Sequence, residues 1–341
     1  MPANLTPEYR TAEAAFRKAR DPGERLECLR EMLRVIPKHK GTDHLQGDIK
    51  RRIKELSDEL ERPRKGGARG GPALMIRPEG AAQLALIGPP NAGKSSLHAR
   101  LTGSGAPAAP YPFTTQYPEP GMMPHEDIAF QLVDLPAVSP EHPVPWLTST
   151  LQSADGCLLV VDLADPASVE EVGAVVAVLQ ERRVTLADRW EPDGESAGVP
   201  AEGDEGPFVL RLPTLLLANK ADRVVDADAE LRAFLEVTRL PYPALAVSAT
   251  TGQALSRIGP WLFGHSGIVR VYTKAPGAPA QRRRPFTLRR GQTVGDVARL
   301  VHKDLARSLK YGRVWGTSGF DGQHVGSQHP VSDGDVIELH V

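Results

Sequence analysis

In residues 6–62, hydrophobic positions recur every three or four residues. They comprise Leu26, Leu29, Leu33 and Ile36, then, after a break at residues 37–41, Leu45, Ile49, Ile53, Leu56 and Leu60. Such spacing places apolar side chains on one face of a helix. It predicts a small helical hairpin or bundle, in which Thr42 or Asp43 can cap the helix that follows the break.

From Ala81 onward the pattern changes to short apolar runs. These β-like runs occupy residues 84–87, 128–133, 157–162, 214–218 and 244–247, and longer stretches such as 167–183 and 226–237 separate them. Alternation of apolar strands with helices is typical of an α/β fold, with a mainly parallel sheet and helices on both faces. Ligands of such sheets bind at the carboxyl ends of the strands, so we expect the functional site there.

The pattern changes once more near Ile268. Short strands are predicted at residues 268–272, 285–288, 313–315 and 335–341, around one helix at 293–307. Turn sequences such as Ser332–Asp335 separate them. This is the pattern of a compact α+β module.

These changes of pattern predict four segments. Residues 1–64 form a helical domain, 65–77 a basic flexible linker, 78–266 the α/β domain and 267–341 the C-terminal module. Within the α/β domain, residues 188–207 contain seven acidic residues, one basic residue and several Pro and Gly. Their composition predicts an exposed or disordered insertion, with a functional acidic segment as the alternative.

Charge is distributed unevenly along the chain, although the formal net charge is only −1. Residues 1–77 hold 18 Lys and Arg against 12 Asp and Glu, residues 267–341 hold 12 against 6, and the centre holds 11 against 24. Two basic ends around an acidic centre suggest that the ends meet a polyanion. Solvated charged faces are the alternative, also for the helix face that carries Lys50, Arg51, Arg52 and Lys54.

The composition argues against membrane and disulfide-stabilised classes. No run of eighteen apolar residues and no N-terminal signal pattern occurs, so we expect a soluble, cytoplasmic protein without membrane contact. The only two cysteines, Cys28 and Cys157, fall in different predicted domains, which argues against a disulfide or a cysteine metal site.

A phosphate-binding motif follows the first of the short strands. Residues 88–96, GPPNAGKSS, fit the pattern G-x-x-x-x-G-K-[ST] between an apolar strand and a helical run. Gly88 and Gly93 let backbone N–H groups turn toward a phosphate, to which the helix N-terminus adds positive potential. Lys94 would contact the β- and γ-phosphates, and the Ser95 hydroxyl would bind Mg²⁺.

Four further segments follow in order, each after an apolar run or in a loop. They are Pro112–Thr115, whose threonine can close over a γ-phosphate; Asp134, which can hold a Mg²⁺ water; Asn219-Lys220-Ala221-Asp222; and Val247-Ser248-Ala249. Asp222 can accept two hydrogen bonds from N1–H and the exocyclic amine of guanine, whereas adenine presents the opposite edge. Asn219 would brace the loops, Lys220 would lie along the base, and the backbone of Ser248 and Ala249 can reach guanine O6. Together these segments predict a guanine-nucleotide domain.

The five motifs resemble the Obg class of GTPases, and within it the developmentally regulated GTP-binding (DRG) proteins. Residues 271–274, 302–303, 310–316, 325–326 and 333–336 are similar to the family's TGS domain, a β-grasp module. Residues 39–60 resemble the helical segment that precedes the GTPase domain in DRG proteins. The resemblance covers most of residues 38–341, with the insertion at 188–207 outside it.

The resemblance implies the roles of individual residues. Phosphate binding would fall to Gly88, Asn91, Ala92, Gly93, Lys94, Ser95 and Ser96, and base binding to Asn219, Lys220, Asp222, Ser248 and Ala249. Ser95 and Thr115 would bind Mg²⁺ directly, and Asp134 would bind it through water. Lys94 and Thr115 would act in catalysis. Asn91 resembles the asparagine of potassium-dependent GTPases, which implies a K⁺ ion beside the phosphates.

Three departures from the family pattern bear on the behaviour of the switch and on the partner. Ala137 replaces the glycine that usually follows DLP, where a Cβ restricts a switch hinge. Residues 138–143, VSPEHP, replace a glycine-rich switch that contains arginine, and residues 188–207 are too short for the extra domain of DRG relatives. No glutamine follows Ala137 to orient the water that attacks the γ-phosphate. Glu141 or His142 could act on this water instead.

We therefore expect a slow, Mg²⁺-dependent and K⁺-accelerated GTPase that binds GTP and GDP. Its basic ends, including Arg282, Arg283 and Arg284, would contact the ribosome or another RNA. The rival hypothesis is a non-hydrolysing guanine-nucleotide sensor that binds a protein partner. We expect a monomer.

Overall fold

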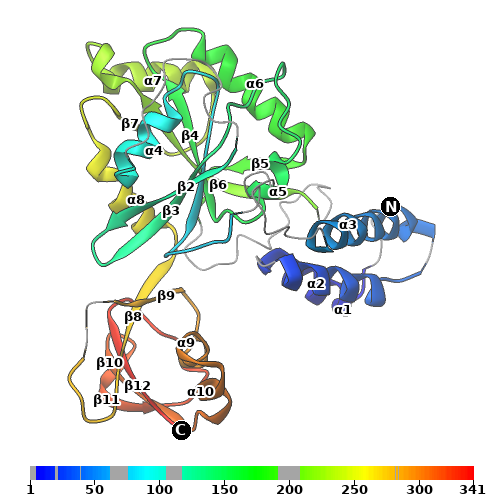
Figure 1. Cartoon of the computed structure of the whole chain (residues 1–341), viewed down its shortest axis with the longest axis vertical. Helices are drawn as coiled ribbons and strands as arrows, with labels where there is room; N and C mark the ends of the chain where they lie inside the picture. Colours follow the sequence, from blue (N-terminus) through cyan, green and yellow to red (C-terminus); the bar gives the residue numbers. More distant parts are fainter. Residues whose placement is uncertain are drawn as a thin grey trace, which may run out of the picture.

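The computed structural model describes residues 5–19, 22–38, 40–61, 76–104, 117–190, 208–280, 282 and 284–341. Figure 1 shows three segments: a large α/β domain, the N-terminal helices beside it, and below it a smaller module that ends at the C-terminus. Most of the predicted linker, most of the acidic insertion, and the Pro112–Thr115 motif lie outside the described residues.

The N-terminal helices are α1 (Pro7–Lys18), α2 (Pro22–Val35) and α3 (Asp43–Glu61), with a short η1 (Lys40–Thr42) before α3. Thr6 caps α1 by accepting a hydrogen bond from the N–H of Tyr9 at 3.2 Å, and Pro7 fits the first helical turn. Tyr9, Phe16, Met32 and other apolar side chains bury one another in the centre. The helices predicted from periodicity are therefore present.

A residue from the α/β domain completes this helical core. Phe208, which lies two residues before strand β6, is buried among the three helices. Its ring packs edge-on against Phe16, with 6.0 Å between ring centroids, and the Arg52 guanidinium lies over the Phe208 ring at 4.3 Å from its centroid. The helical segment is thus anchored to the α/β domain by an aromatic side chain.

The α/β domain is built on a seven-stranded sheet. Its strands are β1 (Gln83–Ile87), β2 (Glu119–His125), β3 (Ile128–Asp134), β4 (Gly156–Asp162), β5 (Val184–Ala187), β6 (Leu210–Asn219) and β7 (Ala244–Ala246). The order is β2-β3-β1-β4-β6-β5, and β7 also pairs with β6. Every pair is parallel except β2–β3, an antiparallel hairpin.

Helices cover both faces of this sheet. They are α4 (Lys94–Thr102), α5 (Leu147–Leu151), α6 (Ser168–Glu181), α7 (Ala227–Thr238) and α8 (Ile258–His265), together with η3 (Ala221–Arg223) and η4 (Leu255–Arg257). Apolar residues of α5, α6 and α7 pack on one face, and those of α4 and α8 pack on the other. The predicted α/β class, with a mainly parallel sheet between helices, is confirmed.

The C-terminal module is a five-stranded sheet with helices on one side. It contains β8 (Ile268–Lys274), β9 (Phe286–Arg289), α9 (Val294–Val301), α10 (Lys303–Ser308), β10 (Tyr311–Gly316), β11 (Gly319–Val325) and β12 (Asp335–His340). The strand order is β11-β10-β12-β8-β9. The single helix predicted at 293–307 is wrong: His302 has extended backbone angles, and its ring accepts a hydrogen bond from the N–H of Asp304 to begin α10.

An arginine joins the C-terminal module to the β2–β3 hairpin. Arg270, on β8, forms ion pairs with Asp127 (3.1 Å) and Asp333 (2.8 Å), and it also pairs with Glu126. Its guanidinium lies 4.6 Å from the ring centroid of Phe263 on α8. These carboxylates raise the pKa of Arg270 above its ordinary value, so the connection remains charged at any physiological pH.

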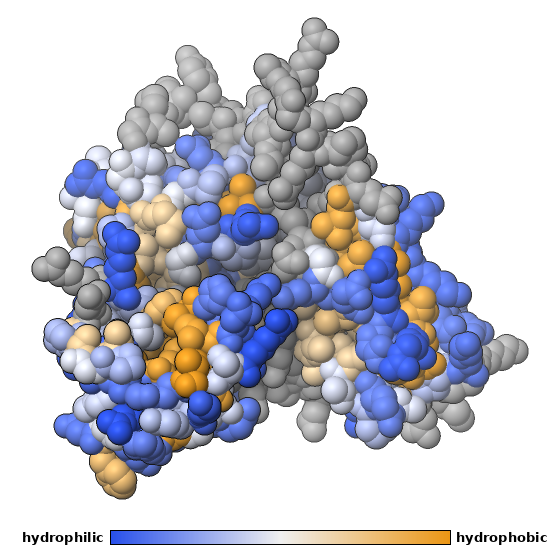
Figure 2. All heavy atoms as spheres, turned by 60° about the horizontal axis from the view of Figure 1, so that its bottom comes forward, coloured by the Kyte–Doolittle hydropathy of each residue, from blue (hydrophilic) through white to orange (hydrophobic). Residues whose placement is uncertain are grey.

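Hydrophilic residues dominate the molecular face in Figure 2, where hydrophobic residues form scattered patches. Within the described part of the chain, no helix is long and apolar enough to span a membrane.

Candidate functional site

The phosphate loop connects β1 to α4, at the carboxyl edge of the sheet. A Cβ at Gly88 would lie 2.2 Å from the carbonyl oxygen of Val160, and a Cβ at Gly93 would lie 2.2 Å from Nδ2 of Asn219. Gly93 also has a φ of 92°, and it is the N-cap of α4. Both positions therefore require glycine, and the loop ends at a helix N-terminus that favours an anion.

The other loop residues predicted to bind phosphate are also in this turn. Asn91 has a φ of 59°, in the left-handed region, and Ala92 is buried beneath the loop. Ser95 and Ser96 lie in the first turn of α4. The whole predicted set is thus one contiguous loop and helix start, as the motif requires.

Lys94 is the buried cation of this loop. Its side chain folds back so that Nζ donates hydrogen bonds to the carbonyl oxygens of Gly88 (3.1 Å) and Pro89 (2.9 Å). Burial lowers the pKa of Lys94 from 10.5 to about 8, although Asp134 and Glu171 act in the opposite direction. A phosphate would supply the counter-charge that the buried ammonium needs.

This pKa predicts how nucleotide affinity varies with pH. Bound phosphate stabilises the charged form of Lys94, so binding above about pH 8 requires uptake of a proton. We expect GDP affinity to be level near pH 7 and to fall by up to about tenfold per pH unit above pH 8. Isothermal titration of GDP at several pH values tests this. A Lys94→Met variant is the control, because its GDP affinity should not show the fall above pH 8 that comes from titration of Lys94.

Ser95 and Asp134 form the oxygen-rich side of the site. The Ser95 hydroxyl donates a hydrogen bond to Oδ2 of Asp134 at 2.6 Å, and Asp134 is buried at the end of β3. A hydroxyl and a carboxylate beside a phosphate loop fit Mg²⁺, which prefers oxygen ligands and keeps several waters. Thr115, the other predicted ligand, lies outside the described residues.

The segment after Asp134 packs against the phosphate loop. The N–H of Val138 donates a hydrogen bond to the carbonyl oxygen of Gly88 at 3.1 Å, and both Ala137 and Val138 are buried. Glu141 and His142 are exposed three and four residues further on. The chain is therefore held in place at Val138, the residue next to Ala137, which replaces the family's usual glycine.

The base side of the site is organised by Asn219, at the end of β6. Its Nδ2 donates to the carbonyl oxygen of Ala92 at 2.9 Å, and its Oδ1 accepts from the N–H of Ala249 at 3.0 Å. The Ser248 hydroxyl donates to Oδ1 of Asp222, which is exposed. One amide side chain thus connects the phosphate loop with the predicted base-binding loop.

Sequence reasoning missed Asp162. This residue ends β4, and its carboxylate forms an ion pair with Nζ of Lys220. Lys220 has a φ of 63°, and the ion pair fixes the direction of its side chain beside the predicted base position. The signal was available, because Asp162 ends an apolar run just as Asp134 does.

Comparisons with known proteins agree with this geometry. Residues 83–188 match the family model described as 50S ribosome-binding GTPase, and residues 269–341 match that of the TGS domain. With the phosphate loop and the parallel sheet, these matches define a GTP-binding protein of the P-loop GTPase class with a C-terminal TGS domain.

The chain is related to the developmentally regulated GTP-binding proteins. It is 26% identical to Developmentally-regulated G-protein 2 of Arabidopsis thaliana, covering 93% of this chain and 90% of the relative. It is 25% identical to the Developmentally-regulated GTP-binding protein 2 homolog of Dictyostelium discoideum, covering 93% of this chain and 98% of the relative. A GTP-binding protein of Methanocaldococcus jannaschii is 26% identical, and the match covers 93% of this chain and 92% of that protein. The resemblance predicted from the motifs is confirmed.

Proposed function

We propose that this chain hydrolyses GTP to GDP and phosphate as a slow molecular switch. The observation that carries the proposal is the bridging position of Asn219, which bonds to Ala92 in the phosphate loop and to Ala249 in the base loop. A ligand that fills both regions must carry phosphates at one end and a base at the other. Asp222 supplies the carboxylate that selects guanine over adenine.

The residues of the site have distinct parts in the proposed reaction. Lys94 neutralises charge on the β- and γ-phosphates, and the N–H groups at the start of α4 hold phosphate oxygens. Ser95 would hold Mg²⁺, with Asp134 binding one of the waters on the ion, and the ion would supply positive charge that offsets the charge of the phosphates. Water attacks the γ-phosphorus in line, the bond from this phosphorus to the β–γ bridging oxygen breaks, and GDP leaves while the γ-phosphate is released as inorganic phosphate with the oxygen of the water.

Potassium would provide further positive charge beside Asn91. We expect K⁺ to accelerate hydrolysis at least several-fold over Na⁺, because a cation at the phosphates offsets negative charge in the transition state. Replacement of Asn91 by Ala should remove the acceleration while GDP affinity stays within about threefold. Phosphate release measured in matched K⁺ and Na⁺ buffers tests this, and equal rates for the unaltered protein would contradict it.

We further propose that the GTPase acts on the ribosome or another RNA assembly. The sheet face of the TGS domain that lies opposite α9 and α10 carries stacked rings, with Tyr311 between His324 (4.6 Å) and His340 (4.5 Å). On the same face, Nζ of Lys274 lies 3.6 Å from the ring centroid of Trp315 and 3.1 Å from Oε2 of Glu338. Aromatic rings and cations on an open sheet are a common way to bind unpaired RNA bases and phosphates.

The basic loop before β9 offers a direct test of the RNA hypothesis. Reversal of charge at Arg282, Arg283 and Arg284 to Glu should weaken ribosome or RNA binding at least about tenfold and reduce its salt dependence, since three phosphate contacts are lost. The same reversal at Arg299, Lys303 and Arg307, on the helical side, is the matched control. Co-sedimentation at two salt concentrations distinguishes the variants, and equal binding by both would remove the support for RNA.

The rival function is a guanine-nucleotide sensor without useful turnover. The observation that favours it is that Ala137 and Val138 are buried and that the N–H of Val138 is bonded to the carbonyl oxygen of Gly88, at a place where a hinge would need freedom. In that case nucleotide would still alter partner binding, and the partner would be a protein. Nucleotide affinity without single-turnover hydrolysis, with and without ribosomes, would support this alternative.

A further inference from the structure

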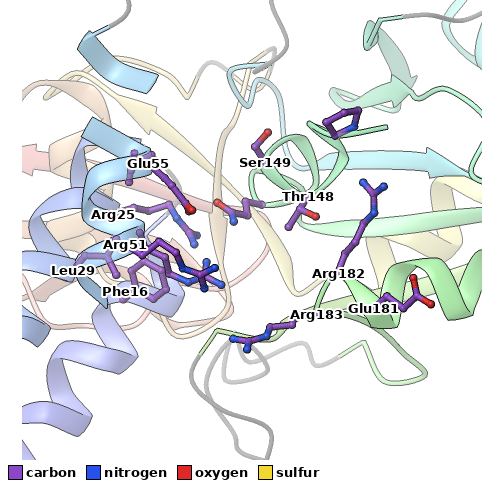
Figure 3. Close-up of a pocket in the computed structure, with 14 residues that line it drawn as sticks. Phe16, Arg25, Leu29, Arg51, Glu55, Thr148, Ser149, Glu181, Arg182 and Arg183 are labelled. Carbon is purple, nitrogen blue, oxygen red and sulfur yellow. The ribbon is translucent and has the colours of Figure 1, made fainter. Parts of the chain in front are cut away.

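A cavity of about 460 Å³ lies between the N-terminal helices and the GTPase domain. One wall comes from α1, α2 and α3, and the other comes from α5 and the end of α6. Figure 3 shows Arg25 and Arg51 on the helical side and Arg182 and Arg183 on the opposite side. The cavity is separate from the nucleotide site, since none of the residues assigned to that site lines it.

Positive charge dominates the cavity walls. Five arginines line it, namely Arg25, Arg51, Arg52, Arg182 and Arg183, against two glutamates, Glu55 and Glu181. Asp48 is the nearby acid that compensates part of this charge, at 3.0 Å from Arg51 and 3.8 Å from Arg183. An excess of positive charge remains where two domains meet, which is the arrangement that attracts a compact anion.

Arg52 is the most enclosed of these cations. Its guanidinium stacks on Phe208, and its buried Nε has no hydrogen-bond partner within the described part of the chain. Desolvation lowers the pKa of Arg52 below its ordinary value; the charges of Arg51 and Arg183 act in the same direction, and those of Glu55 and Asp48 act in the opposite direction. A bound anion would relieve the repulsion between these guanidinium groups.

We propose that this cavity is a second ligand site, which binds a small molecule carrying at least two phosphate groups. Guanidinium forks match phosphate oxygens bidentately, and arginines from both walls can reach one ligand. The volume is that of a small-molecule pocket, and Phe16, Leu29 and Leu56 add an apolar side. A pocket of about 460 Å³ between two domains suits a compact ligand better than a continuous nucleic-acid strand.

Occupation of the site would couple the helical domain to the GTPase domain. The Arg182 guanidinium donates to the carbonyl oxygen of Val144, and Pro145 lines the cavity. Both residues belong to the segment that runs from Asp134 past Ala137 to α5. A ligand held by Arg182 and Arg183 therefore lies against the continuation of the segment that packs on the phosphate loop.

Titration of inorganic pyrophosphate into the full chain tests the proposal. The Lys94→Met variant serves as the parent, so that the phosphate loop does not compete and the result is independent of GTP hydrolysis. We expect one pyrophosphate per chain and a rise in melting temperature. Arg51→Gln with Arg183→Gln should weaken binding at least about tenfold, since both side chains are more than half exposed and their loss should not unfold the protein.

The matched control carries Arg30→Gln and Arg34→Gln on α2. These exposed arginines pair locally with Glu27 and Glu31, so the variant has the same net charge without altering the cavity. Binding that is retained in the control and lost in the cavity variant supports the site. Equal weakening in both, or no saturable binding, would overturn it. Tighter, Arg51-dependent binding of a short single-stranded RNA would also overturn it, and would assign the cavity to nucleic acid.

Discussion

Replacement of Lys94 by Met should lower GTP affinity at least about 100-fold and reduce hydrolysis to background. A hydrogen bond to a charged group contributes about 1.5–3 kcal/mol, and Lys94 would contact two phosphates. Methionine has a similar length without charge, so the buried position stays filled and the protein should remain folded. Equilibrium binding of a fluorescent GTP analogue and phosphate release measure the two effects.

The matched control for this prediction is Lys54→Met, on the exposed face of α3. It removes the same charge far from the phosphate loop, and it should bind GTP as the unaltered protein does. If the Lys94 variant kept its affinity within about threefold, the phosphate loop would not be the nucleotide site.

The second large effect is expected at Asp222. Substitution by Asn should weaken GTP binding at least about 100-fold, because two charge-assisted hydrogen bonds to guanine are lost and an amide N–H₂ faces guanine donors. Xanthine carries a carbonyl in place of the exocyclic amine, so the variant should gain affinity for XTP. Competition between GTP, XTP and ATP measures this change of preference.

Asp228→Asn provides the control for base selection. Asp228 lies in the first turn of α7, it is exposed, and its change alters net charge by the same amount. It should retain the preference for GTP. An Asp222 variant that bound GTP unchanged, or lost all three nucleotides equally, would separate Asp222 from recognition of guanine.

Much of the site could be predicted from sequence because its residues end apolar runs. Asp134 and Asn219 end strands whose burial is evident from their Leu, Ile and Val content, and the carboxyl ends of parallel strands lie at one edge of the sheet. The contact between Gly93 and Asn219 explains why the glycine and the amide must occur together. What the spacing could not give was the ion pair between Asp162 and Lys220, which depends on neighbouring strands in space.

Two of the strands that the sequence pattern did not predict contain proline or glycine, which are uncommon in strands, and they lie at sheet edges. Strand β2 contains Pro120, Gly121 and Pro124, but it lies at the sheet edge, where proline costs no ladder hydrogen bond on the free side. Strand β11 is likewise an edge strand interrupted by glycines. The arginine cavity unites α3 with the end of α6, residues more than a hundred positions apart, so no local pattern could reveal it.

The central claim is turnover of GTP at the phosphate loop, and single-turnover hydrolysis tests it most directly. Protein in excess over γ-labelled GTP, with Mg²⁺ and K⁺, should release phosphate in one exponential phase that is absent from the Lys94→Met variant. The same phase should be slower in Na⁺. Bound GTP that persists unhydrolysed in every buffer, with and without ribosomes, would contradict the account and leave a nucleotide sensor in its place.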